Sequence, residues 1–347
     1  MSFQKISADD VAAVTAATDI LEAARLVDDP SAYPFVPEII AGFIAYGFDL
    51  DPNEHYLYWP EGLDRPVGLL EMDVPERDNR HLAVFELTVH PDHRAGEVHR
   101  AAMLAEAIRI ARAHGRTTMW TWGGEDDGCT RDYLTGQGFT RSARDARRHQ
   151  VLADVDPAAI DLLWDEANAA AVDYELIRMR PPLDDELLAE LAVLAAAIND
   201  APMGDLTYED ELYDARRMSD QQTAGFRRGD RRYRVVARHR TSGEMGGHSE
   251  VAVHPVRPHL GHQADTAVAR AHRGHRLGLL LKIDMMRWLA ETEPGLEVIE
   301  TFNNADNDFM VSVNEALGYR LSRIFTTYEL ALRPDASAPP AGSPAAD

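Results

Sequence analysis

The chain has 347 residues, enough for two domains of ordinary size, and its hydrophobic content of 45% is sufficient for buried cores. The formal net charge of −23 argues against a nucleic-acid or anionic-membrane partner, because phosphate groups would be repelled overall. The single cysteine, Cys129, excludes an internal disulfide and a multi-cysteine metal site. No apolar run is long enough to span a membrane and no signal peptide is recognisable, so we expect a cytoplasmic protein without a bound metal.

The first part of the chain predicts helices and strands that alternate along the sequence. Helices are predicted over residues 9–24, 37–46 and 98–114, and strands over 55–59, 67–71, 82–89, 118–122 and 147–155. A further helix is expected between the last two strands. This alternation is typical of an α/β or α+β sheet flanked by helices.

A linker helix is predicted next, and the same plan then returns. Asp156 and Pro157 form a helix start, with Asp as the cap and Pro in the first turn, and the helix is expected to extend to Ala171. In the second part, helices are predicted over 184–197, 209–226 and 277–290, and strands over 174–179, 233–239, 246–254, 265–269 and 298–302. The tail from Pro334 is rich in Pro, Ala and Ser and is expected to be disordered.

The two parts repeat one another weakly, at a period near 180 residues. The matching segments are 68–71 with 247–250, 93–94 with 272–273, and 138–139 with 318–319. Three anchors in the same order and in nearly the same register indicate tandem copies of one fold. We expect an N-terminal domain over 1–153, a linker helix over 154–173 and a C-terminal domain over 174–333.

The most informative segment is VARAHRGHRLGLLLK, residues 268–282. A strand ends at Val268, and Gly274 and Gly278 bracket the start of an apolar helix. The first N–H groups of a helix have no intrahelical partner and carry partial positive charge, and a glycine-bearing turn in front of them lets the backbone close on a phosphate. Cationic side chains beside these amides come from Arg273, His275 and Arg276. The segment predicts a diphosphate cradle and an enzyme that uses a nucleotide-bearing acyl carrier.

A second signature lies in residues 301–319, where a Thr-x-Asn strand end is followed by a helix with the pattern NxxMxxVNEALGY. Together the two motifs resemble the GNAT N-acetyltransferase superfamily, and especially its tandem-GNAT proteins of actinobacterial type. The match is good over about 175–333 and holds only in outline over about 1–153. The resemblance implies two tandem GNAT-like domains, each a mixed, mostly antiparallel sheet flanked by helices, and acetyl-CoA as co-substrate.

The resemblance also implies which residues hold acetyl-CoA. Strand residues before the cradle would pair with the pantetheine amides. The family's diphosphate pattern Arg/Gln-x-x-Gly-x-Gly/Ala falls on 273–278, with Arg276 in place of the middle glycine, where its charge can compensate. Asn303 and Asn307 match positions that bond the cofactor arm, although Asn is also a preferred helix cap. The implied cofactor-binding residues are Thr266, Ala267, Val268, Arg273, Gly274, His275, Arg276, Leu277, Gly278, Asn303, Asn307 and Asn314.

The first copy departs from this pattern. After Arg94 the sequence reads Ala-Gly-Glu-Val-His, so that the final glycine is lost and Glu97 stands where a diphosphate would need a donor. Two anionic groups at short range repel one another. We therefore expect that the first copy no longer binds acetyl-CoA and serves as a structural partner or as a wall of the substrate pocket.

Acetyl transfer to an amine requires a base for the amine and protonation or stabilisation of the departing thiolate. Asp265 is the first candidate for the base, directly or through water, and Glu300 is the second, although each fits a solvated strand-end acid as well. Many family members carry a tyrosine five residues before the final aromatic, where this chain has Asn314, which cannot act as an acid. The thiolate is then stabilised by Asn314 and backbone N–H groups, or another tyrosine acts, or catalysis is weak. The tyrosines considered, which the sequence does not rank, are Tyr208, Tyr213 and Tyr328.

We expect an N-acetyltransferase that acts in the C-terminal domain on a primary amine of a small cationic molecule, as a monomer or homodimer. Its acceptor pocket should lie where the domains meet, between the stretches 183–197 and 209–226. Acids that could attract the cation are Asp205, Glu209, Asp210 and Glu211. A non-catalytic acyl-CoA-binding or scaffold protein stays open as an alternative, as does an N-acyltransferase that uses a longer acyl-CoA.

Overall fold

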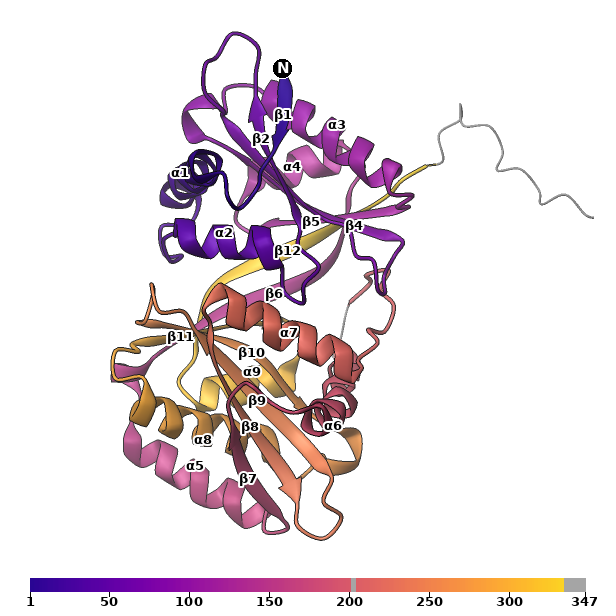
Figure 1. Ribbon diagram of the computed structural model, residues 1–347. Coiled ribbons are helices and arrows are strands. Elements are labelled where there is room, and N and C mark those ends of the chain that lie inside the picture. Colours follow the sequence, from indigo (N-terminus) through magenta and orange to yellow (C-terminus); the bar gives the residue numbers. More distant parts are fainter. Residues whose placement is uncertain (201–203, 334–347) are drawn as a thin grey trace, which may run out of the picture.

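The computed structural model describes residues 1–200 and 204–333, and the tail predicted to be disordered lies outside this range. Figure 1 shows two similar halves, one above the other. The first comprises β1 (Ser2–Lys5), α1 (Val11–Asp28), α2 (Pro37–Tyr46), β2 (Glu54–Trp59), β3 (Gly68–Asp73), β4 (Leu82–Val89), α3 (Val98–Ala113), β5 (Thr118–Gly124), α4 (Gly128–Gly136) and β6 (Thr140–Val151). Helix α5 (Pro157–Ala170) leads into the second.

The second half repeats the order of the first. It comprises β7 (Tyr174–Met179), α6 (Asp185–Ala195), α7 (Ala215–Arg228), β8 (Arg231–His239), β9 (Met245–Val253), β10 (Leu260–Val268), α8 (Leu277–Thr292), β11 (Val298–Asn304), α9 (Asp308–Ala316) and β12 (Arg320–Ala331). The predicted tandem plan is therefore present in the fold.

The strands in the described part of the chain form one twelve-stranded sheet with the order β1-β2-β3-β4-β5-β12-β6-β11-β10-β9-β8-β7. Two neighbouring pairs are parallel, β4 with β5 and β10 with β11. The other neighbours run antiparallel. The mixed, mostly antiparallel sheet expected from the sequence is thus confirmed.

The last strands of the two halves are exchanged. β12 comes from the C-terminal half but lies between β5 and β6, so that it completes the sheet of the N-terminal half. β6 in turn pairs with β11 of the C-terminal half. In Figure 1 the yellow strand β12 crosses from the lower half into the upper one. The two halves therefore share one continuous hydrogen-bonded sheet.

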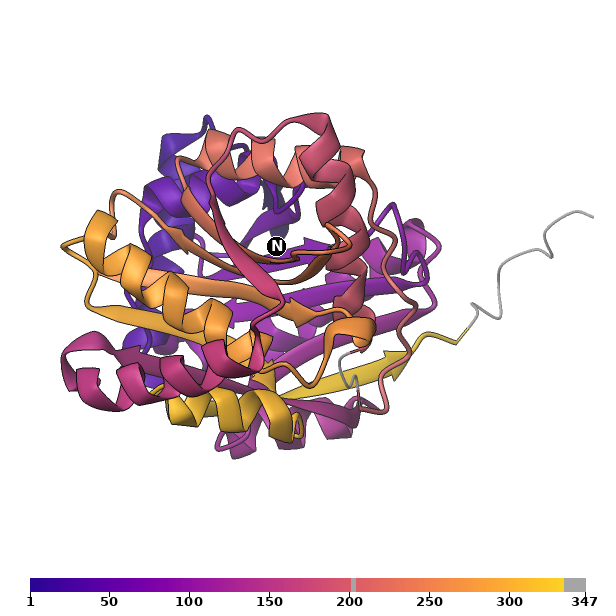
Figure 2. The same cartoon turned by 90° about the horizontal axis from the view of Figure 1, so that it is seen from below.

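Helices cover both faces of the sheet, because successive strand residues point to opposite sides. In β3, Leu69 packs with α1 and α2, whereas Leu70 and Met72 pack with α3 and α4. In the C-terminal half, α6 and α7 cover one face and α5, α8 and α9 the other. Figure 2 shows these two helix layers with the strands between them.

Three predicted elements begin at least five residues away from their expected first residue. β6 begins at Thr140 and pairs with both β11 and β12. The sequence did not predict its first residues as a strand because many of their side chains are charged. β10 begins at Leu260, in a segment whose polar residues do not favour a strand in isolation. The helix predicted from residue 209 begins at Ala215, after Asp214, whose side chain caps it by accepting a hydrogen bond from the Arg217 backbone N–H. The short edge strand β1 was not predicted.

Candidate active site

A cavity of about 830 Å³ opens between β10 and β11. Residues Leu260–Gln263 of β10 pair with residues Val298–Thr301 of β11. Beyond these residues the two strands diverge beside the first turn of α8. The volume is within the range of small-molecule and cofactor sites. We call this space the cofactor cavity, because most of the cofactor-binding residues implied by the resemblance line it. They are Thr266, Ala267, Val268, Arg273, Gly274, Arg276, Leu277, Gly278, Asn303, Asn307 and Asn314. His275 does not line it, because its ring lies against Tyr174 and its Nδ1 is 3.4 Å from the Ala170 carbonyl oxygen.

The turn before α8 leaves the first N–H groups of the helix open to the cavity. Gly274 has a φ of +89°, a left-handed conformation that glycine adopts without steric cost. The residue that caps α8 makes no side-chain hydrogen bond to the first turn. A Cβ built on Gly278 would have no atom closer than Phe309 Cε1, at 4.0 Å. Unsatisfied amides at an open helix start are suited to an anion such as a diphosphate.

Arg276 has a left-handed backbone conformation, which glycine adopts more readily than other residues. Its φ and ψ are 53° and 23°, in the left-handed region, which costs a residue with a side chain about 1–2 kcal/mol. The guanidinium donates to Glu166 Oε2 of α5 at 2.6 Å, and both side chains are more than half exposed.

A chain of polar side chains crosses the floor of the cofactor cavity. Asn314 Nδ2 donates to Asn303 Oδ1 at 3.3 Å, and Asn314 Oδ1 accepts from Lys282 Nζ at 2.8 Å. Asn307 caps α9, since its Oδ1 accepts from the Met310 backbone N–H at 3.2 Å, and it also lines the cavity. Lys282 was not among the predicted site residues. The available signal was a lone lysine in the apolar stretch LGLLLKI at the start of a buried helix.

A second cavity, of about 600 Å³, lies between the two halves of the chain. We call it the acceptor pocket. Among the described residues its lining includes eight carboxylates, those of Asp49, Asp51, Asp73, Glu76, Asp78, Asp210, Glu211 and Asp265. Two guanidinium groups, from Arg77 and Arg217, and the rings of Trp120, Trp122, Tyr208 and Tyr213 complete its polar and aromatic walls. Ile198 lines both cavities, so the two spaces adjoin.

Asp265 stands at the junction of the two cavities. The strand register shifts between Gln263 and Thr266, and within this bulge Ala264 and Thr266 line the cofactor cavity while Asp265 lines the acceptor pocket. The enclosing protein, and then the negative charge of Glu250, raise the pKa of Asp265 above its ordinary value. A carboxylate with a raised pKa is a better proton acceptor for an amine than an ordinary aspartate.

Glu300, the second predicted base, lines neither cavity, although the next residue, Thr301, lines the cofactor cavity. Its Oε2 accepts from His149 Nε2 at 2.9 Å on the neighbouring strand β6, and Arg147 lies 3.8 Å from it. The hydrogen bond from His149 and the nearby positive charges outweigh burial and lower the pKa of Glu300. The structure therefore places Asp265, and not Glu300, in the lining of the acceptor pocket.

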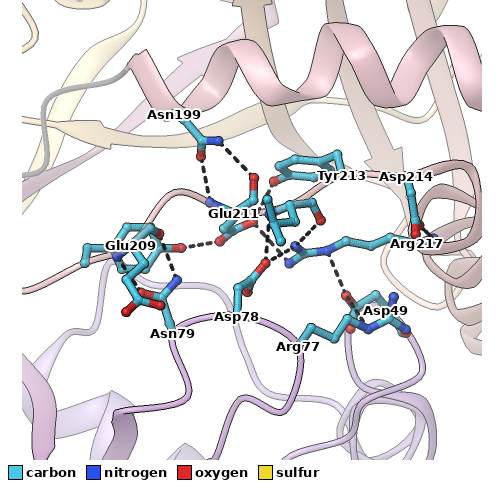
Figure 3. Close-up of polar contacts among 12 residues, drawn as sticks. Asp49, Arg77, Asp78, Asn79, Asn199, Glu209, Glu211, Tyr213, Asp214 and Arg217 are labelled. Carbon is cyan, nitrogen blue, oxygen red and sulfur yellow. Dashed lines mark hydrogen bonds and ion pairs between the residues drawn. The ribbon is translucent and has the colours of Figure 1, made fainter.

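The residues before α7 form a connection that ties the C-terminal half to the N-terminal half, as Figure 3 shows. Asn79 Nδ2 donates to the Glu209 carbonyl, and the Glu209 N–H donates back to Asn79 Oδ1 at 2.7 Å. The Leu212 N–H donates to Asp78 at 2.9 Å. Of the four acids predicted to attract a cation, Asp210 and Glu211 line the acceptor pocket, whereas Asp205 and Glu209 do not.

Arg217 is the centre of an ion network on one wall of the acceptor pocket (Figure 3). It donates to Asp78 at 2.8 Å, Glu211 at 3.1 Å and Asp49 at 3.2 Å. Only 12% of its side chain is exposed, and its guanidinium lies over the Tyr213 ring. The network joins carboxylates from both halves through one cation.

The three tyrosines considered as proton donors lie in two different places. Tyr208 and Tyr213 line the acceptor pocket, where both hydroxyls donate to Glu211. Burial and the Glu211 carboxylate raise the pKa of both phenols. Tyr328 is buried in the core of the N-terminal half and lines neither cavity.

The matching turn of the first copy is occupied by the chain's own groups. Arg94 makes two hydrogen bonds to the Asp28 carboxylate, at 2.6 and 2.7 Å. Gly96 keeps a positive φ of 78°, and Glu97 caps α3 without a side-chain hydrogen bond to the helix. The two turns differ at the helix cap, where Glu97 has a φ of −90° and a carboxylate, whereas Arg276 has a φ of 53° and a guanidinium.

Two absences hold for residues 1–200 and 204–333. None of their helices is both long enough and apolar enough to cross a bilayer. No three or more His, Cys, Asp or Glu side chains among them are grouped as a metal ion would require.

Comparison with solved structures identifies relatives of the whole chain. A tandem GNAT protein from the clavulanic acid biosynthesis pathway is 26% identical, with a TM-score of 0.79 over 96% of this chain and 99% of its own. A GCN5-related N-acetyltransferase from Sphaerobacter thermophilus is 15% identical, with a TM-score of 0.64 over 96% of each chain. A GCN5-related glucosamine N-acetyltransferase region of a fungal multi-domain β-N-acetylglucosaminidase is 13% identical, with a TM-score of 0.66 over 95% of this chain and 38% of that one.

No protein-family model matches the chain, and no curated protein matches it significantly. The structural neighbours nevertheless confirm the predicted resemblance to tandem GNAT proteins and the tandem α/β fold. They also support the prediction that the chain is an acyltransferase.

Proposed function

We propose that this protein transfers the acetyl group of acetyl-CoA to a primary amine of a small cationic molecule. The single observation that carries the proposal is the position of Asp265, which lines the acidic acceptor pocket while its neighbours Ala264 and Thr266 line the cofactor cavity. Ile198 lines both spaces, so a donor in the cofactor cavity and an amine in the acceptor pocket would meet where these spaces adjoin, beside Asp265. Holding two reactants together in this way is a large part of the catalysis of a bimolecular step.

The cofactor cavity has the features that acetyl-CoA requires. The open amides at the start of α8, with Arg273 and Arg276 beside them, would hold the diphosphate. The diverging edge of β10, from Thr266 to Val268, would pair with the pantetheine amides. Acetyl-CoA supplies the activated thioester, and the protein orients it against the acceptor.

The charge of the acceptor pocket favours a cation. The eight carboxylates outnumber the two guanidinium groups, and their mutual repulsion is visible at Asp73, where burial and the charges of Asp51 and Asp49 raise the pKa to about 6. A bound ammonium group would relieve this repulsion. Asp265 would accept the proton that the ammonium must lose before its nitrogen attacks the thioester.

Binding of acetyl-CoA is tested with a matched pair of variants at Gly278. The Gly278→Glu variant places a carboxylate at the open helix start, and we expect a loss of affinity of about 10- to 10³-fold from charge repulsion. The Gly278→Ala variant should bind like the wild type, because its Cβ meets no atom closer than 4.0 Å. The measurement is the acetyl-CoA-dependent shift in Tm. A wild-type Tm that does not respond to acetyl-CoA would contradict the proposal.

Turnover separates the proposal from its main alternative, a non-catalytic acyl-CoA-binding or scaffold protein. We expect thiol release from acetyl-CoA in the presence of amines that carry additional positive charge, and weaker release with neutral amines of the same size. Raising the salt concentration should increase KM for the cationic amines, because the attraction is screened. Binding without turnover on any amine would favour the scaffold protein. Faster turnover with longer acyl-CoAs would favour an N-acyltransferase of different chain specificity.

A further inference from the structure

Lys282 is a buried cation in the wall of the cofactor cavity. It lies on α8 four residues, or about one helical turn, beyond Gly278, and only 2% of the residue is exposed. It lines the same cavity as the open helix start and Asn314. A lysine is almost never buried to this extent unless it is paired or functional.

The surroundings of Lys282 provide little compensation for its charge. Its Nζ donates one hydrogen bond, to Asn314 Oδ1 on α9, and lies 4.7 Å from the centre of the Tyr319 ring. Asn314 in turn donates a hydrogen bond to Asn303 of β11. Within the described residues no carboxylate forms an ion pair with Lys282, and burial raises the pKa of the Tyr319 phenol whose ring lies near it. Two N–H bonds of the ammonium are thus left for a ligand in the cavity.

The proposed reaction still lacks a group that protonates or stabilises the departing thiolate, and an ammonium at this place could do so. A proton or a positive charge stabilises a departing thiolate more than a neutral hydrogen-bond donor does, and Asn314 can supply neither. Burial lowers the pKa of Lys282 to about 7, which brings it into the range in which a group both holds and releases a proton at neutral pH.

We infer that Lys282 is the group that faces the thioester sulfur of bound acetyl-CoA and donates a proton to the CoA thiolate as it leaves. The inference rests on the proposed acetyl transfer. The amine nitrogen forms its bond to the carbonyl carbon, the C–S bond breaks with its electron pair on sulfur, and a proton passes from Lys282 Nζ to that sulfur. The amine loses its own protons by way of Asp265 and solvent, and solvent returns one proton to Lys282. The products are the N-acetylated amine, CoA thiol and one released proton.

The first test measures the ionisation of bound CoA by thiolate absorbance as the pH is raised. In the wild type the bound thiol should ionise at lower pH than free CoA, because the Lys282 ammonium stabilises the thiolate. In Lys282→Met this ionisation should return towards that of free CoA, a shift of about one pH unit or more. The matched control is Arg287→Met on the same helix, which loses an ion pair with Asp161 outside the cavity. Equal titrations in the wild type and Lys282→Met would overturn the inference.

The second test compares turnover in two variants. Lys282→Met should lower kcat about 10²-fold or more, the lower range of the effect of a general acid. Lys282→Arg keeps a positive charge but cannot release a proton near neutral pH, so it should retain the low thiol pKa of bound CoA and still lose kcat. A kcat unchanged in both variants would contradict proton donation. If the wild type fails to bind acetyl-CoA, the proposed function itself fails, and this outcome is separated from failure of the inference by the Tm shift.

The Tm of Lys282→Met distinguishes the inferred role from a purely structural one. The inferred role predicts a rise in Tm, and a structural role predicts a fall. The native state bears the penalty of a buried ammonium in full below about pH 7, and the penalty is relieved as the pH rises from about 7 towards the ordinary value of 10.5. Without ligand, Lys282→Met should therefore have a Tm a few degrees above that of the wild type. The gain should be largest below pH 7 and should shrink towards pH 10. A lower Tm in Lys282→Met at pH 6 would indicate a structural lysine instead.

Discussion

The Asp265→Asn variant is expected to lower kcat for acetyl transfer about 10²- to 10⁴-fold, the range that a positioned general base contributes. Asparagine has nearly the same shape but accepts no proton. Because Asp265 lines the acceptor pocket and not the cofactor cavity, the acetyl-CoA-dependent shift in Tm should be retained. Steady-state thiol release gives kcat, and the thermal shift shows that the cofactor still binds.

Glu300→Gln is the matched control for this prediction. Glu300 is the alternative base, also lies on a strand of the C-terminal half, is bonded to His149 and lines neither cavity. Its kcat should therefore stay near that of the wild type. A large loss of kcat in Glu300→Gln, together with an active Asp265→Asn, would transfer the role of base to Glu300.

The pH dependence of kcat/KM in the wild type should also report the ionisation of Asp265. Asp265 acts as a carboxylate, so activity is present above its pKa and is lost as the pH falls through it. Because the enclosing protein and Glu250 raise this pKa, the acid limb of kcat/KM should lie above the ordinary aspartate value of 3.8. In Asp265→Asn this limb should be absent from the residual rate. An acid limb that persists unchanged would assign it to another group.

The Arg217→Met variant is expected to lower the free energy of unfolding by about 3–5 kcal/mol, the cost of breaking a buried ion pair by removing one partner. The loss arises because Asp78 and Glu211 would lose their shared cation, while Asp49 would be left with Arg77 at 3.9 Å. Asp49 and Asp78 belong to the N-terminal half and Glu211 to the C-terminal half, so the variant also weakens the contact that forms the acceptor pocket. Urea unfolding followed by circular dichroism measures the change.

Arg320→Met is the control for a surface ion pair. Arg320 and Asp154 are 3.8 Å apart and more than half exposed, and such pairs contribute about 0–1 kcal/mol. In Arg217→Met the deficit should be full at neutral pH and should decrease as the pH falls, because the unpaired carboxylates then take up protons. If both arginine variants unfold at the same urea concentration, the network does not hold the halves together.

Much of the cofactor cavity could be predicted from the sequence because its parts are local. Gly274, Gly278 and the cationic residues between them lie within one turn and the helix start that follows it, so their spacing alone brings their amides together. His275 lies in the same turn but does not line the cavity, because its ring lies against Tyr174. A position in a loop determines which backbone groups are near, but packing decides where each side chain points.

The amino-acid sequence by itself determined the tandem plan, the α/β class and the turn that opens α8, because each depends on periodicity, capping and turn residues within short segments. The tertiary structure alone decided the exchange of β6 and β12, the burial of Lys282 beside Asn314, and the acceptor pocket that Asp78, Glu211 and Asp265 form. These features join residues from opposite halves or from separate elements. Strand order and side-chain burial are set by the free energy of packing the whole chain, which no local pattern encodes.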